Sequence, residues 1–264
     1  MNPLVDSHCH LDASEFDADR PAVIARARAA GVVAQLLPAV DRASWPVIRA
    51  LCAADPGLRP AYGLHPMFLD QHQAAHLDEL SDWLERERPA AVGECGLDYF
   101  VPGLDPEEQR KYFQRQLELA REHALPLVVH ARRAVDEVIS RVRRTGGLCG
   151  VVHSWSGSEV QARQLFDLGF CLGIGGPVTF ERAQRLRRTV ATMPIEFLLL
   201  ETDAPDQPDA AHRGQRNEPG RLPEVLRVVA ALRDQDEAEV AQATSANAAR
   251  LFGPWPVSPP LAQA

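Results

Sequence analysis

Lysine is almost missing from this sequence of 264 residues: Lys111 is the only one, and arginine carries nearly all the positive charge. Cysteine is also sparse, with five residues, scattered and odd in number, and no Cys-x-x-Cys pair. This pattern is typical of buried thiols in a reducing compartment and argues against a disulfide framework. We therefore expect a cytoplasmic protein.

Long apolar runs are absent as well. No run approaches the roughly 20 residues that a membrane-spanning helix needs, and the N-terminus lacks the basic region and apolar core of a secretion signal. The net charge is −8, whereas a broad duplex-binding face usually makes a domain basic. We expect no membrane partner and no extensive wrapping of duplex DNA, although bound divalent cations would reverse the sign of the charge locally.

What the sequence does contain is a series of short, continuous apolar runs, as expected for parallel strands covered on both faces. They recur at about the spacing of βα units. A chain of this length with about eight such units predicts a single-domain α/β TIM (β/α)8 barrel over residues 1–253, with a tail over 254–264. An open doubly wound sheet is the alternative. The runs lie at residues 4–5, 32–37, 60–64, 90–93, 127–129, 151–152, 170–174 and 197–200.

Helical patterns separate these runs. The strongest start signal is Asp105-Pro106-Glu107-Glu108, which combines a cap, a first-turn proline and acids at the positive end of the helix dipole. That helix is predicted to end near Ala124. Other helices are predicted over residues 134–144 and 181–191, with closing helices over 222–233 and 237–252.

Histidines and carboxylates follow the apolar runs. Glu94 stands where the run 90–93 ends, and a buried carboxylate must find a cation, because desolvating it unpaired is costly. In a TIM barrel such residues meet at the C-terminal ends of the strands. The residues at these positions are His8, His10, His65, Glu94, His130, His153, Glu201 and Asp203.

Imidazole and carboxylate donors without a thiolate suit Zn²⁺, Mn²⁺ or a similar cation, or Mg²⁺ with more water. The donors are too many for one tetrahedral site, which favours two divalent metal ions bridged by a carboxylate. Lys111 falls within a predicted helix, so it cannot supply the carboxylated-lysine bridge of some related barrel hydrolases, and Glu94 is the expected bridge. His130 and His153 could each be structural histidines if taken alone.

His8 and His10 alternate along an extended segment and are expected to face the same way. Cys9 would then point to the other side, and we expect it to pack in the core. Cys95 has the same expected role.

Six segments together resemble the TatD family of metal-dependent deoxyribonucleases and hydrolases. The resemblance implies a TIM barrel in which His8, His10, Glu94 and Asp203 hold one ion, while Glu94, His130 and His153 hold the other. It also implies that His65 and Arg132 contact substrate phosphate. The segments are Asp6-Ser7-His8-Cys9-His10-Leu11-Asp12, Gly63-Leu64-His65-Pro66, Gly93-Glu94-Cys95-Gly96-Leu97-Asp98-Tyr99, His130-Ala131-Arg132, His153-Ser154-Trp155-Ser156-Gly157 and Glu201-Thr202-Asp203-Ala204-Pro205.

Some positions depart from the commonest family pattern. Arg133 stands where many relatives carry an acid, and Trp155 replaces a more usual phenylalanine. Residues 175–180 form a variant of their own. These departures suggest a less characterised branch and bear on the substrate more than on the metals.

The expected chemistry is hydrolysis by a water that the metal ions activate. Asp203, Glu94 and His65 are the expected catalytic residues, and Asp203 would take the proton of the water. His65 and Arg132, with Arg133, would neutralise phosphate charge.

Two further residues are expected to line the substrate site. Trp155 could stack on a base, and ordinary packing at the barrel rim is the alternative. Glu201 could orient a metal ligand from behind, with a salt bridge inside the barrel rim as its alternative.

We expect a deoxyribonuclease-type phosphodiesterase acting on DNA or a small phosphoester. The alternative is a hydrolase of a small ester, lactone or amide at the same site, because the same activated water serves all these bonds. A non-catalytic protein that binds metal or nucleic acid is the third possibility. No obligatory protein partner is indicated.

Overall fold

The computed structural model describes residues 3–255, and its eight strands form one parallel sheet in the order β1 to β8. A backbone hydrogen bond from Ser7 to Leu200, 3.0 Å long, joins the two ends of this order and closes the barrel. The strands are β1 Leu4–Asp6, β2 Val32–Pro38, β3 Leu58–Tyr62, β4 Ala91–Asp98, β5 Leu127–Arg132, β6 Gly150–Val152, β7 Phe170–Ile174 and β8 Leu198–Leu200.

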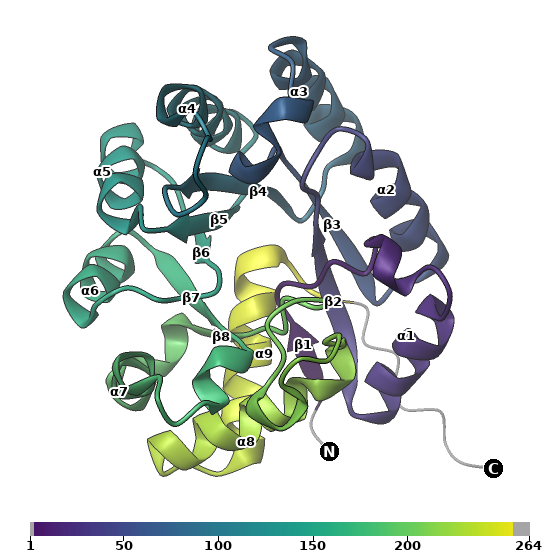
Figure 1. Ribbon diagram of the computed structural model, residues 1–264, viewed down its shortest axis with the longest axis vertical. Coiled ribbons are helices and arrows are strands. Elements are labelled where there is room, and N and C mark those ends of the chain that lie inside the picture. Colours follow the sequence, from purple (N-terminus) through teal and green to yellow (C-terminus); the bar gives the residue numbers. More distant parts are fainter. Residues whose placement is uncertain (1–2, 256–264) are drawn as a thin grey trace.

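Helices surround the strands, as Figure 1 shows for α1 to α8. The sequential strand order and the ring of helices confirm the predicted TIM barrel and rule out the doubly wound alternative. The helices are α1 Arg20–Ala29, α2 Ser44–Ala54, α3 Ala75–Glu87, α4 Pro106–Glu122, α5 Val135–Thr145, α6 Glu159–Asp167, α7 Gln184–Thr192, α8 Leu222–Arg233 and α9 Glu237–Phe252.

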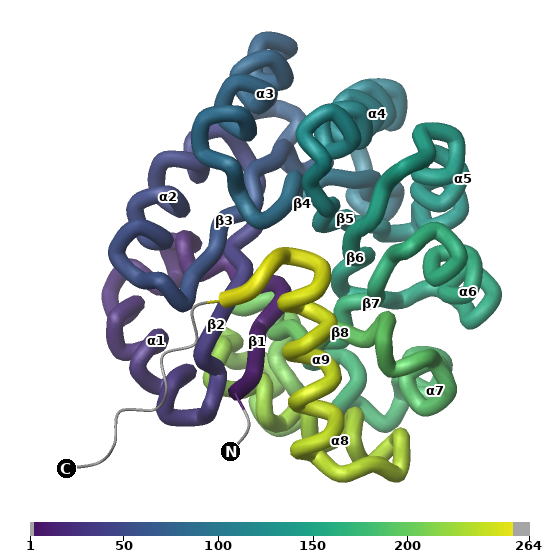
Figure 2. Tube along the Cα trace, turned by 180° about the vertical axis from the view of Figure 1, so that it is seen from behind, coloured from purple at the N-terminus to yellow at the C-terminus, as the bar shows by residue number. Residues whose placement is uncertain are grey.

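The last helix, α9, lies across one end of the barrel beside β1 and β8 (Figure 2). Its Phe252 and the following Trp255 pack into an apolar cluster with barrel residues such as Leu36 and Leu199. Because this end is filled by side chains, a site can open only at the other end, where the strands finish.

Some boundaries differ from the predictions. Trp255 is 7% exposed and its ring contacts Phe252 with centroids 6.3 Å apart, so the predicted tail does not begin at 254; the rest of it, residues 256–264, lies outside the described residues. Strand β3 ends at Tyr62 rather than at 64. Helix α3 had no sequence prediction.

The predicted cap of α4 and the predicted burial of two cysteines are confirmed. The Asp105 carboxylate caps α4 by accepting the backbone N–H of Glu107 at 2.8 Å. Cys9 and Cys95 are fully buried in the main core. Within residues 3–255, no helix combines the length and hydrophobicity needed to cross a membrane.

Candidate metal centre

The Glu94 carboxylate lies at the centre of the barrel mouth, and its two oxygens face two different groups of side chains. Oε2 lies 3.1 Å from His8 Nε2 and 3.4 Å from His10 Nε2. Asp203 Oδ1 lies 3.4 Å and 3.6 Å from the same two nitrogens. These four atoms, from the ends of β1, β4 and β8, form the first donor set.

The other oxygen, Glu94 Oε1, faces three histidines. It lies 2.8 Å from His153 Nε2, 3.2 Å from His130 Nδ1 and 2.8 Å from His65 Nε2. His130 Nδ1 and His153 Nε2 are 3.3 Å apart. Glu94 Oε1, His130 Nδ1 and His153 Nε2 form the second donor set.

The spacing of the first set is close to that around a bound cation, whereas the second set is tighter, with Glu94 Oε1 2.8 Å from His153 Nε2. Donor atoms that hold one ion tetrahedrally at about 2.0–2.2 Å lie roughly 3.3–3.6 Å from one another. The distances around His8, His10, Glu94 and Asp203 run from 3.1 to 3.6 Å. Nitrogen and carboxylate oxygen are also the donors that zinc and similar ions take.

His8 and His10 do not lie on a strand, although the alternation argument assumed that they do. Strand β1 ends at Asp6, and the chain beyond it runs extended between its neighbours. Cys9 N–H donates to Leu36 O in β2 at 3.1 Å, and His10 N–H donates to Ala204 O at 2.8 Å. His8 and His10 still point together, with their Nε2 atoms 3.1 Å apart.

The hydrogen bonds of His65 distinguish its role from that of the histidines in the two donor sets. Its Nδ1 accepts the backbone N–H of Met67 at 3.1 Å, and burial lowers the pKa of the ring to about 4. A neutral imidazole that accepts at Nδ1 carries its proton on Nε2. His65 Nε2 is therefore a hydrogen-bond donor, although it lies as close to Glu94 as the histidines of the second donor set.

The opposite tautomer would suit His130 as a ligand. Its Nε2 lies 2.9 Å from Asp98 Oδ2, so a proton on Nε2 faces that carboxylate and leaves Nδ1, 3.2 Å from Glu94 Oε1, to present a lone pair to a cation. Sequence reasoning gave Asp98 no role. The signal was present, because Glu94 and Asp98 stand an even number of residues apart on β4 and so share one face of the strand.

Glu201 lies behind the histidines. It is fully buried and accepts the backbone N–H of Ser154 at 2.6 Å, with His153 Nδ1 3.8 Å from the same oxygen. Burial raises its pKa to about 8. Gly173 makes room for it, since a Cβ at that position would overlap the Glu201 carboxylate. Glu201 has no surface to offer a substrate. The 3.8 Å separation is too long for a hydrogen bond to His153 Nδ1, so the orienting role of Glu201 stays a prediction.

Charge in the donor sets is balanced by protons. Burial raises the pKa of Glu94, but His153, His65 and His8 outweigh it and hold that pKa well below its usual range. Burial lowers the pKa of His153, yet Glu94 outweighs burial and raises it to about 10. Cations bound here would replace such protons, as metal binding to imidazole requires.

The chain resembles known proteins over nearly its whole length. The family model described as TatD related DNase matches residues 5–253. The chain is 40% identical to "Uncharacterized metal-dependent hydrolase YjjV" of Escherichia coli K12, over 94% of this chain and 97% of that protein.

The chain belongs to the TatD family.

TatD relatives match in structure as well as in sequence. The crystal structure of the Escherichia coli TatD homologue YJJV superimposes with a TM-score of 0.92 at 37% identity, over 95% of this chain and 98% of that one. The chain is also 34% identical to a protein of Klebsiella pneumoniae named "3'-5' ssDNA/RNA exonuclease TatD", over 95% of this chain and 98% of that protein. This chain is accordingly a member of a family of metal-dependent hydrolases.

Of the other residues expected in a TatD substrate site, two are exposed to solvent and one is buried. Arg132, the last residue of β5, and Arg133, which follows it, are both exposed. Trp155 is only 3% exposed and packs in the main core, so it offers no face for a base and the packing alternative describes it. Lys111 lies on α4 and pairs with Glu108 at 3.6 Å, away from the strand ends, as expected.

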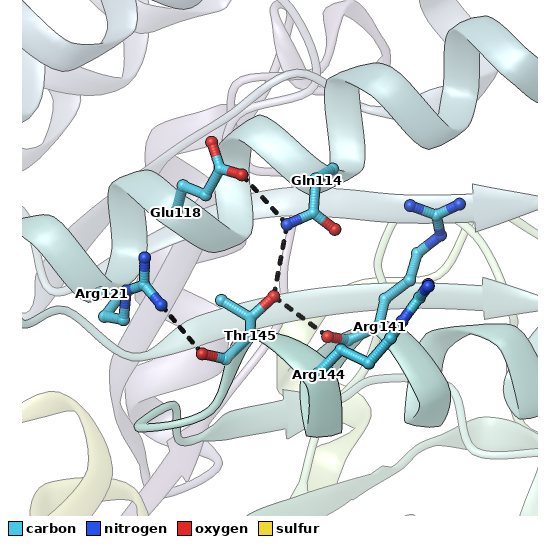
Figure 3. A pocket seen from close by; sticks show the side chains of 6 residues that line it. All are labelled: Gln114, Glu118, Arg121, Arg141, Arg144 and Thr145. Atoms are coloured by element: carbon cyan, nitrogen blue, oxygen red, sulfur yellow. Dashed lines mark hydrogen bonds between the residues drawn. The ribbon is translucent and has the colours of Figure 1, made fainter.

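A pocket of about 360 Å³ opens on the outer flank, between α4 and α5 (Figure 3). Gln114 bridges Glu118 and Thr145 there, and Arg121 donates to the Thr145 carbonyl at 2.9 Å. Its lining has a single carboxylate and no histidine or cysteine. It therefore lacks the donors that the barrel mouth supplies.

Proposed function

We propose that this TatD-family chain is a phosphodiesterase that cleaves DNA with two divalent metal ions. The observation that supports the proposal is the placement of the Glu94 carboxylate between two donor sets. Each of its oxygens lies 2.8–3.2 Å from nitrogen atoms of its own set. A carboxylate placed in this way is the usual bridge of two-metal hydrolases.

The chain's own residues then have separate roles. Bound divalent ions would supply a water acidic enough to ionise near neutral pH and would offset phosphate charge. Asp203, whose Oδ2 accepts a hydrogen bond from the Gln207 amide, orients that water and accepts its proton. His65, whose Nε2–H faces Glu94 Oε1 at 2.8 Å in the structure, would donate a hydrogen bond from Nε2 to a phosphate oxygen. Arg132 and Arg133 bind further phosphate oxygens.

The name of one relative supports DNA as the substrate class, because the Klebsiella pneumoniae protein is called an exonuclease on single-stranded DNA and RNA. Single-stranded nucleic acid also suits a chain with net charge −8. Such a substrate needs only local contacts at a cation-bearing mouth rather than a broad basic face.

The test compares substrates after metal removal. Protein stripped with a chelator is reloaded with Zn²⁺, Mn²⁺ or Mg²⁺, and its metal content is measured by mass spectrometry. We expect two ions per chain and metal-dependent cleavage of single-stranded DNA. A panel of small esters and lactones is assayed in parallel. Turnover on that panel with no cleavage of DNA under any metal would overturn the proposal.

A pair of variants tests the bridge. Glu94→Gln removes the shared charge and should lower DNA cleavage at least about 100-fold, the upper end of what losing even a supporting residue costs. Glu108→Gln makes the same change on the exposed face of α4 and should leave the rate unchanged. Near-normal cleavage by Glu94→Gln, with circular dichroism showing an intact fold, would contradict the two-metal bridge.

A further inference from the structure

Phe100 is an exposed aromatic ring at the barrel mouth. It is 44% exposed, and within residues 3–255 it is the one aromatic among the large apolar side chains that are exposed. It follows β4 by two residues, in the loop that leads to α4 (Figure 1). A single exposed apolar ring is common on protein surfaces, so a ligand here is indicated only by what surrounds Phe100.

A single carboxylate ties this ring to the metal centre. Asp98 Oδ1 accepts the backbone N–H of Phe100 at 2.8 Å and that of Val101 at 3.0 Å. The other oxygen, Oδ2, lies 2.9 Å from His130 Nε2. The backbone of Phe100 is therefore held one side chain away from a histidine of the second donor set.

Two guanidinium groups lie against the ring. The Cζ of Arg132 is 3.7 Å from the ring centroid, and that of Arg133 is 4.6 Å from it. Both distances are well within the range of cation–π contacts. Neither guanidinium forms an ion pair or hydrogen bond with any side chain of the described residues, so their N–H donors remain available to an anion.

Backbone conformation brings both arginines to one ring. Consecutive residues of a strand point to opposite faces, but β5 ends at Arg132 and Arg133 has a φ of 56°, in the left-handed region. A long side chain rarely adopts this conformation, because its Cβ crowds the following carbonyl. Strain of this kind is concentrated at functional sites.

From this geometry we infer that Phe100, Arg132 and Arg133 form a stacking platform for an unpaired base next to the phosphate that is cleaved. The exposed part of the ring, with the guanidinium planes against it, offers a stacking surface to a base. The guanidinium N–H groups offer donors to the adjoining phosphate. The inference rests on the proposed function and narrows its substrate to single-stranded nucleic acid, because a base held in a duplex cannot leave its stack without cost.

The platform takes the place that the sequence suggested for Trp155, which is buried. Base–aromatic stacking changes affinity about 5- to 150-fold per base. A small ester or an abasic phosphodiester has no base to stack. The effect of Phe100 should therefore appear with intact oligonucleotides and disappear with abasic ones.

The experiment measures binding of a labelled five-nucleotide single strand by fluorescence anisotropy in EDTA, where cleavage is stopped, and kcat/KM with metal-loaded protein. Phe100→Ala should weaken binding at least about fivefold and lower kcat/KM on the same strand. Phe100→Trp should restore both, because tryptophan also presents a π face. Val160→Ala, on the exposed face of α6 (60% exposed), is the matched control and should change neither.

An abasic strand of the same length separates stacking from other effects. If Phe100→Ala weakens binding to the intact strand and leaves the abasic strand unchanged, the platform is supported. Equal losses on both strands, or no loss on either, would overturn it.

The wild-type protein distinguishes this failure from failure of the proposed function. Cleavage of single-stranded DNA by wild type, with Phe100→Ala equally active, would refute only the platform. Metal-dependent turnover on small esters with no binding or cleavage of DNA would refute both.

Discussion

The contact between Asp98 and His130 leads to a prediction that concerns only the second donor set, the one formed by Glu94 Oε1, His130 and His153. In Asp98→Asn, the amide oxygen can still accept the N–H groups of Phe100 and Val101, which keeps the loop closed. The amide NH₂ then faces His130 Nε2 in place of Oδ2. An NH₂ donates, so His130 must present a lone pair at Nε2 and carry its proton on Nδ1.

That proton would sit on the atom that faces Glu94 Oε1, 3.2 Å away, and would block it as a ligand. Changes to a residue that orients a ligating histidine cost about 10- to 100-fold in metal affinity, or about 1.4–2.7 kcal/mol. We expect a loss of this size for one ion. The site formed by His8, His10, Glu94 and Asp203 should keep its affinity, because Asp98 touches none of those side chains.

Competition with a chelating dye, using Zn²⁺ and Mn²⁺, would resolve two affinities. Asp82→Asn makes the same change at an exposed position on α3 and serves as the control. Thermal unfolding of the metal-free variants checks that the fold is retained. Unchanged affinity at both sites, or equal weakening at both, would show that Asp98 does not fix the His130 tautomer.

Two further predictions concern stability. Gly173→Ala would drive a methyl group into the Glu201 carboxylate; overpacking costs about 1–3 kcal/mol, so the Tm of the metal-free protein should fall by roughly 2–12 °C, and an unchanged melting curve would contradict the tight fit. Glu137 is partly buried, which raises its pKa, but hydrogen bonds from Arg110 and Tyr99 outweigh this and lower it from 4.5 to about 2. Its ionised form therefore stabilises the fold above about pH 4.5, and this contribution is lost as the pH falls toward 2. In urea unfolding at pH 7, Glu137→Gln should be less stable than wild type by about 1–2 kcal/mol, a figure reduced to allow for the partial exposure of this side chain. The difference in unfolding free energy should shrink by about pH 3. A difference that does not change with pH would refute the assignment.

The sequence made the barrel and its metal-binding mouth predictable. Parallel strands buried on both faces leave short continuous apolar runs, and their spacing carries the βα repeat. Because every such strand ends at the same rim, residues as far apart in the sequence as His8 and Asp203 could be assigned to one cluster from the sequence alone. Asp98 could also have been found, since it shares a face of β4 with Glu94.

Other features were not predictable from the sequence. Trp155 and Phe100 both follow strands, but Trp155 is buried in the core and Phe100 is exposed to solvent. The tautomer of His65 depends on the Met67 N–H, and the strand β1 proved too short to hold His8 and His10.

The sequence by itself determined which kinds of atoms this protein gathers, because donor type and apolar periodicity are local properties of the chain. Only the tertiary structure decided how those atoms are divided between the two oxygens of Glu94 and which side chains remain free to meet a substrate. Both depend on contacts between segments far apart in the chain, which a local sequence pattern does not encode.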